Sequence, residues 1–178
     1  MSDMKKKYNE EVVPALTKSQ GYKNVMQVPK LKKIVISMGI GTKMEKDAFT
    51  EAKNILTAIA GQLPVVTKAR KNVANFKLRA GMPVGLMVTL RGNIMYEFLD
   101  RLVHNALPRV RDFRGIPKKG FDHVGNYNLG MPDVSVFTEV DLDKLKYPLG
   151  LNITMVTSAK TDAEAKELLS LLEVPFAR

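Results

Sequence analysis

Alternating apolar and polar residues predict β-strands in this chain. In residues 32–39 the apolar side chains Ile34, Ile36 and Met38 fall on every second position. Successive side chains of a strand point to opposite faces, so this pattern is typical of a strand with one buried and one polar face. The predicted strands are residues 32–39, 64–68, 84–92, 134–140 and 149–159.

Apolar positions three to four residues apart predict helices elsewhere. Before the final apolar stripe, Thr161 and Glu164 have the spacing of a capping box, a typical helix start. The predicted helices cover residues 3–18, 47–60 and 94–107 and the residues that follow Thr161. Residues 110–132 are rich in Gly, Asn, Arg and Lys with little periodicity, which indicates a long ordered loop.

Together these elements predict one α+β domain over residues 1–178. Alternating strands favour a mostly antiparallel sheet, with helices packed on its apolar face and a long basic loop. The other face would carry polar side chains, namely Ser37, Thr89, Arg91, Asn152 and Thr154. Hydroxyls, an amide and a guanidinium suit the 2′-hydroxyls and phosphates of RNA, although any half-exposed sheet has a polar side.

The distribution of charge strengthens the case for a polyanionic partner. The chain has a net charge of +10, and no acidic residue lies between Glu51 and Glu97. Residues 1–120 hold 23 bases and 9 acids, whereas residues 121–178 hold 5 bases and 9 acids. Unpaired cations attract phosphate, so we expect a nucleic-acid surface on the basic part. The acidic end is either a surface for a basic protein or simply two solvated elements.

The cations gather in two places. The first is the basic loop, residues 68–81, where Phe76 would either stack on a base or anchor the loop in the core. The second is the basic segment, residues 109–119, where Asp112 could hold one arginine in place. Lys5 to Lys7, in the first turn of a helix whose dipole disfavours cations, suggest an external anion there.

Catalytic and metal chemistry have little support in the sequence. The chain has no cysteine, which excludes disulfides and thiolate sites. Neither His104 nor His123 has a serine or carboxylate at a recognisable spacing. Residues 115–120 resemble a phosphate loop without its lysine, and Asp141 with Asp143 lacks the rest of a calcium loop. We therefore expect no cofactor and no metal.

Three functional hypotheses remain at this point. The first is an RNA-binding protein that uses its cations and loops. The second is an enzyme acting on nucleic acid, and the third is a protein-interaction module that uses the acidic end. No apolar run approaches the ~20 residues that span a membrane, and the first residues lack the apolar core of a signal peptide. We therefore expect a cytoplasmic protein without a membrane partner.

Long segments of the chain resemble a known family. They are NVMQVPKLKKIVISMGIG, AGQLPVVTKARKNVANFKLRAGMPVGLMVTLRG, YEFLDRLV, LPRVRDFRGI, GNYNLG and VPFAR. In this order they resemble the bacterial form of the fifth family of large-subunit ribosomal proteins, which binds 5S rRNA. The resemblance runs from Tyr22 to Arg178, and it implies a structural ribosomal protein without catalysis.

The resemblance also implies partners and contact residues. For 5S rRNA we expect contacts from Asn24, Lys33, Ser37, Gln62, Thr89 and Arg91. For peptidyl-site tRNA we expect contacts from the basic loop, through Lys68, Arg70, Lys71, Asn75, Lys77 and Arg79. For 23S rRNA in the central protuberance we expect contacts from Arg109, Arg111, Arg114, Lys118 and Lys119. Residues 133–146 would meet a basic protein of the small-subunit head, and neighbouring large-subunit proteins would be further partners.

Some positions depart from the usual pattern of that family. Ser37 stands where the family usually has Asn, which replaces an amide with a shorter hydroxyl. His123 and Val124 stand in place of Gly-Arg, and Thr138 in place of Pro. These changes would alter individual contacts with RNA or protein without changing the resemblance.

Overall fold

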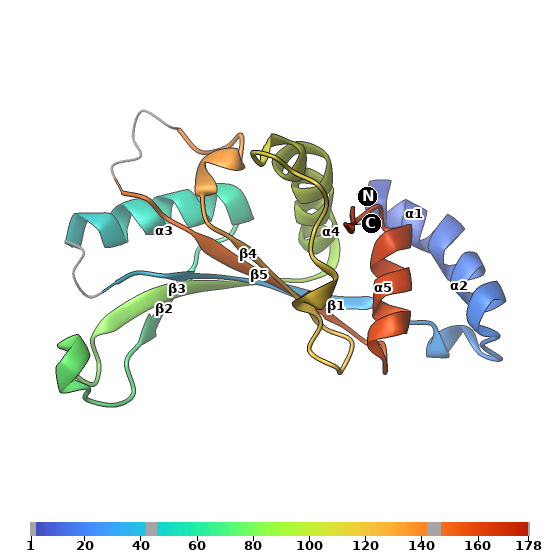
Figure 1. Cartoon of the computed structure of the whole chain (residues 1–178), viewed down its shortest axis with the longest axis horizontal. Coiled ribbons are helices and arrows are strands. Elements are labelled where there is room, and N and C mark those ends of the chain that lie inside the picture. Colours follow the sequence, from blue (N-terminus) through green and yellow to red (C-terminus); the bar gives the residue numbers. More distant parts are fainter. Residues whose placement is uncertain (1–2, 42–45, 142–146, 178) are drawn as a thin grey trace. The chain divides into compact units, whose positions relative to one another are not determined.

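A computed structural model describes residues 3–41, 46–141 and 147–177. Within these residues, strands β1 to β5 form one antiparallel sheet in the order β2-β3-β1-β5-β4 (Figure 1). The strands are β1 (Leu31–Gly39), β2 (Val65–Lys68), β3 (Pro83–Leu90), β4 (Tyr127–Met131) and β5 (Leu151–Thr157). The α-helices are α1 (Asp3–Lys7), α2 (Val13–Gln20), α3 (Lys46–Ala60), α4 (Gly92–Arg101) and α5 (Asp162–Leu171). The predicted α+β class with an antiparallel sheet is confirmed.

The chain divides into two compact units. One comprises Met1–Ile34, Leu90–Leu129 and Thr154–Arg178, and the other comprises Val35–Thr89 and Gly130–Ile153. All four boundaries fall inside strands, so neither unit is a continuous piece of sequence. The expectation of one domain over residues 1–178 stays a prediction.

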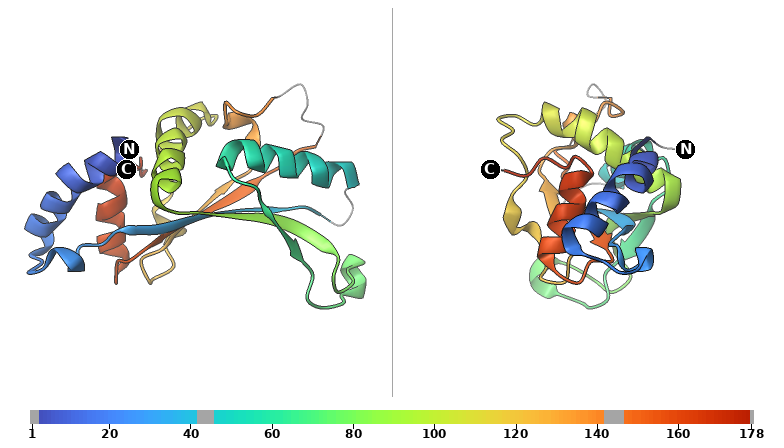
Figure 2. Two further views of the ribbon diagram at one scale, coloured as in Figure 1. Left: turned by 180° about the vertical axis from the view of Figure 1, so that it is seen from behind. Right: turned by 90° about the vertical axis from the view of Figure 1, so that its right-hand side faces the viewer.

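In the second unit, helix α3 lies over one face of the sheet (Figures 1 and 2). The predicted stripe is buried at Ala48, Ala52, Leu56 and Ile59. The alternation predicted along the strands is also confirmed. The core-facing apolar positions of β1, β3 and β5 are buried, except Val84, which is half-buried. The polar positions between them form the opposite face of the sheet, which includes the expected 5S rRNA contacts Ser37 and Thr89.

In the first unit, the N-terminal helix is interrupted rather than regular. A π-helical turn, Tyr8–Val12, joins α1 to α2. Pro14 lies in the first turn of α2, where its missing N–H costs no intrahelical bond. Gly21, with φ of 67°, ends α2 and donates its N–H to Thr17 O at 3.1 Å. A π-helical turn also follows α4, at Leu102–Ala106, before the turn that contains Pro108.

Two sequence expectations are corrected. The predicted strand at residues 134–140 is instead a 3₁₀ turn, Val134–Val136, because Asp133 accepts a hydrogen bond from Ser135 N at 2.8 Å and turns the chain. Conversely, the predicted loop at residues 110–132 ends in strand β4. There Tyr127, Leu129 and Met131 are buried in alternation.

The final helix begins as the capping box predicts. Thr161 is the N-cap and accepts a hydrogen bond from Glu164 N at 3.4 Å. The Glu164 carboxylate turns back to Lys160 N at 3.0 Å, one residue before the N-cap. Every helix in the described part of the chain is too short or too polar to cross a membrane.

Candidate nucleic-acid interface

The basic loop connects two paired strands. Strand β2 pairs antiparallel with β3, with Val65 opposite Met87, and the register shifts at Lys68. The pairing continues beyond the strands, because Ala69 N donates to Met82 O at 2.8 Å and Gly81 N donates to Ala69 O at 2.9 Å. The base of the loop is therefore a hydrogen-bonded extension of the sheet.

The tip of the loop has its own backbone structure. Val73 and Leu78 exchange two hydrogen bonds of 3.0 Å around a 3₁₀ turn, Ala74–Phe76. Lys77 closes that turn with a φ of 53°, and the Asn72 carboxamide accepts Ala80 N at 2.7 Å. All of these bonds are local, so the sequence of the loop specifies its shape with little help from elsewhere.

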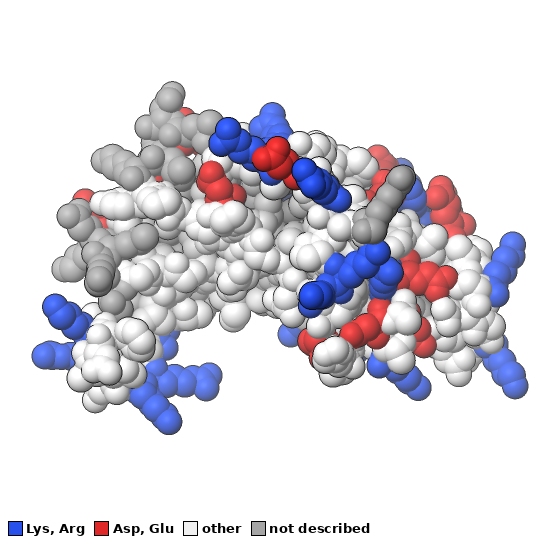
Figure 3. All heavy atoms as spheres, viewed as in Figure 1, with Lys and Arg blue, Asp and Glu red and all other residues white. Residues whose placement is uncertain are grey.

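The polar residues of the basic loop point to solvent. Figure 3 shows lysine and arginine side chains projecting around this hairpin, at the lower left. The predicted tRNA contacts Lys68, Arg70, Lys71, Asn75, Lys77 and Arg79 are all exposed. Its cations form no ion pair within the described part of the chain. Exposed cations without carboxylates are available to a polyanion.

Phe76 lies at the tip of the basic loop and is 66% exposed. The alternative in which this ring anchors the core is therefore wrong. Proteins that bind single-stranded nucleic acids present exposed aromatic rings among cations, and bases stack on those rings.

The candidate 5S rRNA contacts fall in both units. Ser37 and Thr89 lie half-buried on the polar positions of the neighbouring strands β1 and β3, and Gln62 is exposed after α3. These three belong to the second unit, whereas Asn24, Lys33 and Arg91 belong to the first. Asn24 is already engaged in part, because its side chain accepts Met26 N at 2.9 Å as a helix cap.

Sequence reasoning missed one part of this surface. Val65 and Met87 are directly paired across β2 and β3, and they are 65% and 38% exposed. Met87 follows the same alternation as Thr89, so its position in the strand was the signal that could have identified it. This apolar pair is suited to contact ribose and base edges beside the polar groups.

The basic segment, residues 109–119, is held differently from the basic loop. The predicted 23S rRNA contacts Arg109, Arg111, Arg114, Lys118 and Lys119 are exposed. Asp112 forms no ion pair with an arginine among the described residues, so its expected holding role is wrong. Instead the backbone is anchored at Ile116, whose N–H donates to Pro175 O at 2.7 Å.

An aromatic cluster supports the end of this segment. Tyr127 is fully buried, and its hydroxyl donates to Pro117 O at 2.7 Å. The ring centroids of Phe121 and Phe176 lie 4.8 Å and 5.5 Å from that of Tyr127. Burial raises the pKa of Tyr127 to about 12, so the hydroxyl remains a donor throughout the ordinary pH range.

A short turn follows the basic segment. Asp122 accepts hydrogen bonds from the Asn126 side-chain amide, from Asn126 N at 2.9 Å and from Val124 N at 3.0 Å. These bonds, the one from the side-chain amide first, lower the pKa of the Asp122 carboxyl. His123 is exposed, adopts a φ of 65°, and places Nδ1 3.3 Å from Asp162. A left-handed conformation favours glycine, the residue that the family resemblance leads us to expect at this position.

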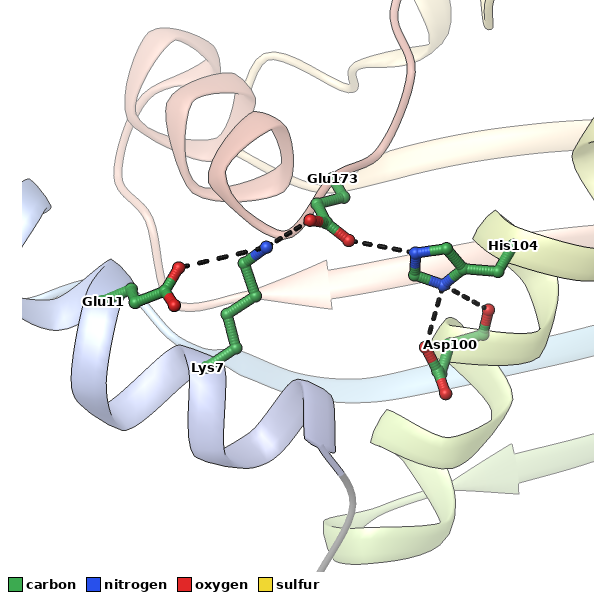
Figure 4. A network of polar contacts seen from close by, with 5 residues as sticks. All are labelled: Lys7, Glu11, Asp100, His104 and Glu173. Carbon is green, nitrogen blue, oxygen red and sulfur yellow. Dashed lines mark hydrogen bonds and ion pairs between the residues drawn. The ribbon is translucent and has the colours of Figure 1, made fainter.

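His104 belongs to a polar network rather than to a catalytic site. Figure 4 shows its ring between Asp100 and Glu173, with Nδ1 2.9 Å from Asp100 Oδ1 and Nε2 3.0 Å from Glu173 Oε2. Glu173 also pairs with Lys7, which lies 4.0 Å from Glu11. The external anion expected near Lys7 is thus replaced by carboxylates of the same chain.

The acidic end contributes to a hollow in the second unit. This hollow has a volume of about 490 Å³ and is lined by Asp47, Thr50, Glu51, Asn54, Ile55, Ala58, Glu139, Val140 and Asp141. The predicted protein contact covers residues 133–146, and its part from residue 142 onward lies outside the described residues.

Over the described ranges, no three His, Asp or Glu side chains gather as metal ligands would.

Comparison with known families agrees with this geometry. Residues 24–79 match the family model of ribosomal protein L5, and residues 83–176 match the model of the C-terminus of the same ribosomal family. The chain belongs to the ribosomal protein L5 family. The join between the two matches falls next to the start of β3, so each match contains one strand of the basic hairpin.

Named relatives align along the whole chain. "Large ribosomal subunit protein uL5" of Geobacter sp. (strain M21) is 56% identical over 177 residues, covering 99% of both chains. The protein of the same name from Thermoanaerobacter sp. (strain X514) is 54% identical over 179 residues, covering 100% of both. The family resemblance inferred from the sequence is thereby confirmed.

Proposed function

We propose that this chain binds 5S rRNA, attaches it to 23S rRNA in the central protuberance, and contacts peptidyl-site tRNA through the basic loop. Its family makes it a structural protein of the large ribosomal subunit, and not an enzyme. The proposal therefore concerns which surface meets which RNA.

The observation that carries the proposal is the architecture of the basic loop. Five cations and an exposed phenylalanine are displayed on a hairpin whose shape is maintained by local backbone bonds. A rigid projection of this kind can reach an RNA without the entropy cost of ordering a flexible tail. Phosphate contacts from Lys68, Arg70, Lys71, Lys77 and Arg79 would supply affinity, with Asn75 and Phe76 meeting exposed bases.

The 5S rRNA surface would be the polar face of the sheet. Ser37, Gln62 and Thr89 supply hydroxyl and amide groups of the kind that read ribose hydroxyls in RNA. Asn24, Lys33 and Arg91, which belong to the first unit, would make their own contacts with phosphate. Ser37 has a shorter side chain than the usual Asn, so its contact would pass through water or be weaker.

The remaining surfaces would complete the assembly on the ribosome. The exposed cations of the basic segment would contact 23S rRNA. Residues 133–146 would meet a basic protein of the small-subunit head, supported by the excess of acids over bases in residues 121–178. Neighbouring large-subunit proteins are further expected partners.

A salt series tests the 5S rRNA assignment. We expect the purified chain to bind 5S rRNA more tightly than tRNA or duplex DNA, with the logarithm of the affinity falling linearly with that of salt concentration. The slope should be about −0.7 to −0.9 for each phosphate neutralised. Equal competition by all three nucleic acids would reduce the interaction to charge alone and contradict the assignment.

Two matched charge variants test the division between surfaces. One replaces Lys68, Arg70, Lys71, Lys77 and Arg79 with Gln, and the other replaces Arg109, Arg111, Arg114, Lys118 and Lys119 with Gln. Both remove five positive charges. The first should spare 5S rRNA binding but weaken peptidyl-site tRNA retention on reconstituted ribosomes, and the second should weaken attachment to 23S rRNA. If the two variants lose all activities equally, the proposed division is wrong and a general protein-interaction role gains support.

A further inference from the structure

The segment Pro175–Ala177, here called the strap, runs beside the basic segment. Ile116 N donates to Pro175 O at 2.7 Å, and Ala177 N donates to Ile116 O at 2.9 Å. These bonds form a parallel bridge between Ile116 and Phe176. Ile116 itself is 2% exposed, so its backbone groups depend on the strap for their partners.

Gly115 allows this close approach. It has a φ of 103°, and a Cβ atom at this position would lie 2.5 Å from Ala177 N and 2.7 Å from Phe176 C. Those atoms are backbone, which cannot rotate away as a side chain would. The basic segment therefore follows a path that requires both glycine at 115 and the strap beside it.

Phe176 also joins the aromatic cluster that supports the end of the segment. Its ring centroid lies 5.9 Å from that of Phe121 and 5.5 Å from that of Tyr127. Gly120 packs against Tyr127, because a Cβ atom there would lie 2.7 Å from a carbon of that ring. The turn that carries Lys118 and Lys119 thus rests on a surface to which the strap contributes a ring.

The start of the strap is fixed from two other elements. Glu173, with a φ of 63°, pairs with Lys7 of α1 and with His104 of the turn after α4 (Figure 4). Val174 is buried, and its N–H donates to Leu169 O at 3.0 Å. The strap therefore leaves the helical part of the first unit in a defined direction.

We propose that Phe176 and its neighbours in the strap are positioning residues for 23S rRNA, because they hold the cations of the basic segment in a binding-competent arrangement. This inference rests on the proposed function of that segment. Without the strap, the segment would have to be ordered when RNA binds, and the affinity would fall by roughly tenfold.

The first test replaces Phe176 with Ser in the full chain, with Ile94→Ser as the control, because Ile94 is an apolar residue of α4 that is 44% exposed. The chain is loaded with 5S rRNA and titrated with a 23S rRNA transcript. Phe176→Ser should weaken this binding by roughly tenfold and speed amide exchange at residues 115–121. Ile94→Ser should change neither, and both variants should bind 5S rRNA as the parent chain does.

A second pair of variants keeps the Phe176 ring in place. Gly115→Ala introduces a Cβ atom against the strap. Gly21→Ala also places a side chain at a positive φ, 67° against 103° at Gly115, but with no atom within 4 Å of the added carbon. Gly115→Ala should reproduce the faster exchange and weaker 23S rRNA binding, and Gly21→Ala should not. Phe176→Tyr, which keeps the ring, should restore most of the affinity lost in Phe176→Ser.

The outcomes separate this inference from the proposed function. Faster exchange with unchanged 23S rRNA binding would show that the strap is only structural and would overturn the positioning role. Unchanged exchange in both Phe176→Ser and Gly115→Ala would overturn it as well. A parent chain that fails to bind 23S rRNA would instead refute the proposed function, and the inference with it.

Discussion

The basic loop and the basic segment each carry five lysines and arginines, yet they are held by opposite means. Hydrogen bonds between residues at most 13 positions apart, such as Ala69 to Met82, form the basic loop. The basic segment instead depends on Pro175–Ala177, about sixty residues further along the chain, and on buried Tyr127. Charge content therefore does not indicate how a binding surface is built.

This difference has consequences for stability. The basic loop is exposed along nearly its whole length, so changes within it should stay local. The basic segment is connected to the core of the first unit, so damage to its supports should lower the free energy of unfolding of the protein. The losses of stability expected for Tyr127→Ala, Asn72→Ala and Glu173→Gln decrease in that order. Phe76→Ala, the contrast to Tyr127→Ala, should change stability least.

The largest effect is expected for Tyr127→Ala. This change leaves a cavity under the basic segment and should lower the free energy of unfolding by about 3–5 kcal/mol, measured by urea denaturation. Tyr127→Phe, which removes only the hydrogen bond to Pro117 O, should lower the free energy of unfolding by about 1 kcal/mol.

Phe76→Ala is the corresponding change in the basic loop. Because that ring is 66% exposed, the variant should change the free energy of unfolding by less than about 0.5 kcal/mol. Equal losses in Tyr127→Ala and Phe76→Ala would remove the distinction between the two regions.

An intermediate effect is expected for Asn72→Ala. The loss of the bond from Ala80 N should destabilise the tip of the basic loop by about 1 kcal/mol. Amide exchange at Leu78 and Ala80 should therefore be faster, with no change at Ile116. Asn75→Ala is the control, since the exposed Asn75 side chain has no hydrogen bond among the described residues. Faster exchange at Ile116 would show that the two regions are coupled.

A smaller effect that depends on pH is expected at Glu173, just before the strap. The Lys7 ammonium beside Glu173 holds the pKa of that carboxyl below its ordinary value of 4.5. A lowered pKa means that the carboxylate stabilises the fold above pH 4.5, and that this stabilisation disappears as the pH falls through the folded-state pKa.

Glu173→Gln should therefore lower the free energy of unfolding by about 0.5 kcal/mol at pH 7, a small effect because the side chain is 44% exposed and screened by water. In strong acid, where the carboxyl is protonated, the variant should have no effect. Urea denaturation at several pH values measures this difference, and Glu97→Gln on the exposed side of α4 serves as the control. A loss that is independent of pH would show that the ion pair with Lys7 is not its origin.

Much of the fold follows from local patterns. The strands at Ile34–Met38 and Leu151–Met155 and the helix after Thr161 were predictable because alternation and capping depend on neighbouring residues. The two errors have different local causes. Gly130 obscured the alternation of β4, while the Asx turn at Asp133 overrode an alternating pattern in residues 134–140.

The fold class and the two basic regions could be read from the chain alone, because composition and local periodicity are properties of neighbouring residues. The family followed from the resemblance of long segments of the sequence. Three further facts required the folded molecule. Phe76 is exposed, Asp112 pairs with no arginine that the structure describes, and Phe176 and Ala177 lie against the basic segment. Those facts depend on which residues distant in sequence meet and which do not. Such contacts form only when burial of the core offsets the entropy lost on closing long loops.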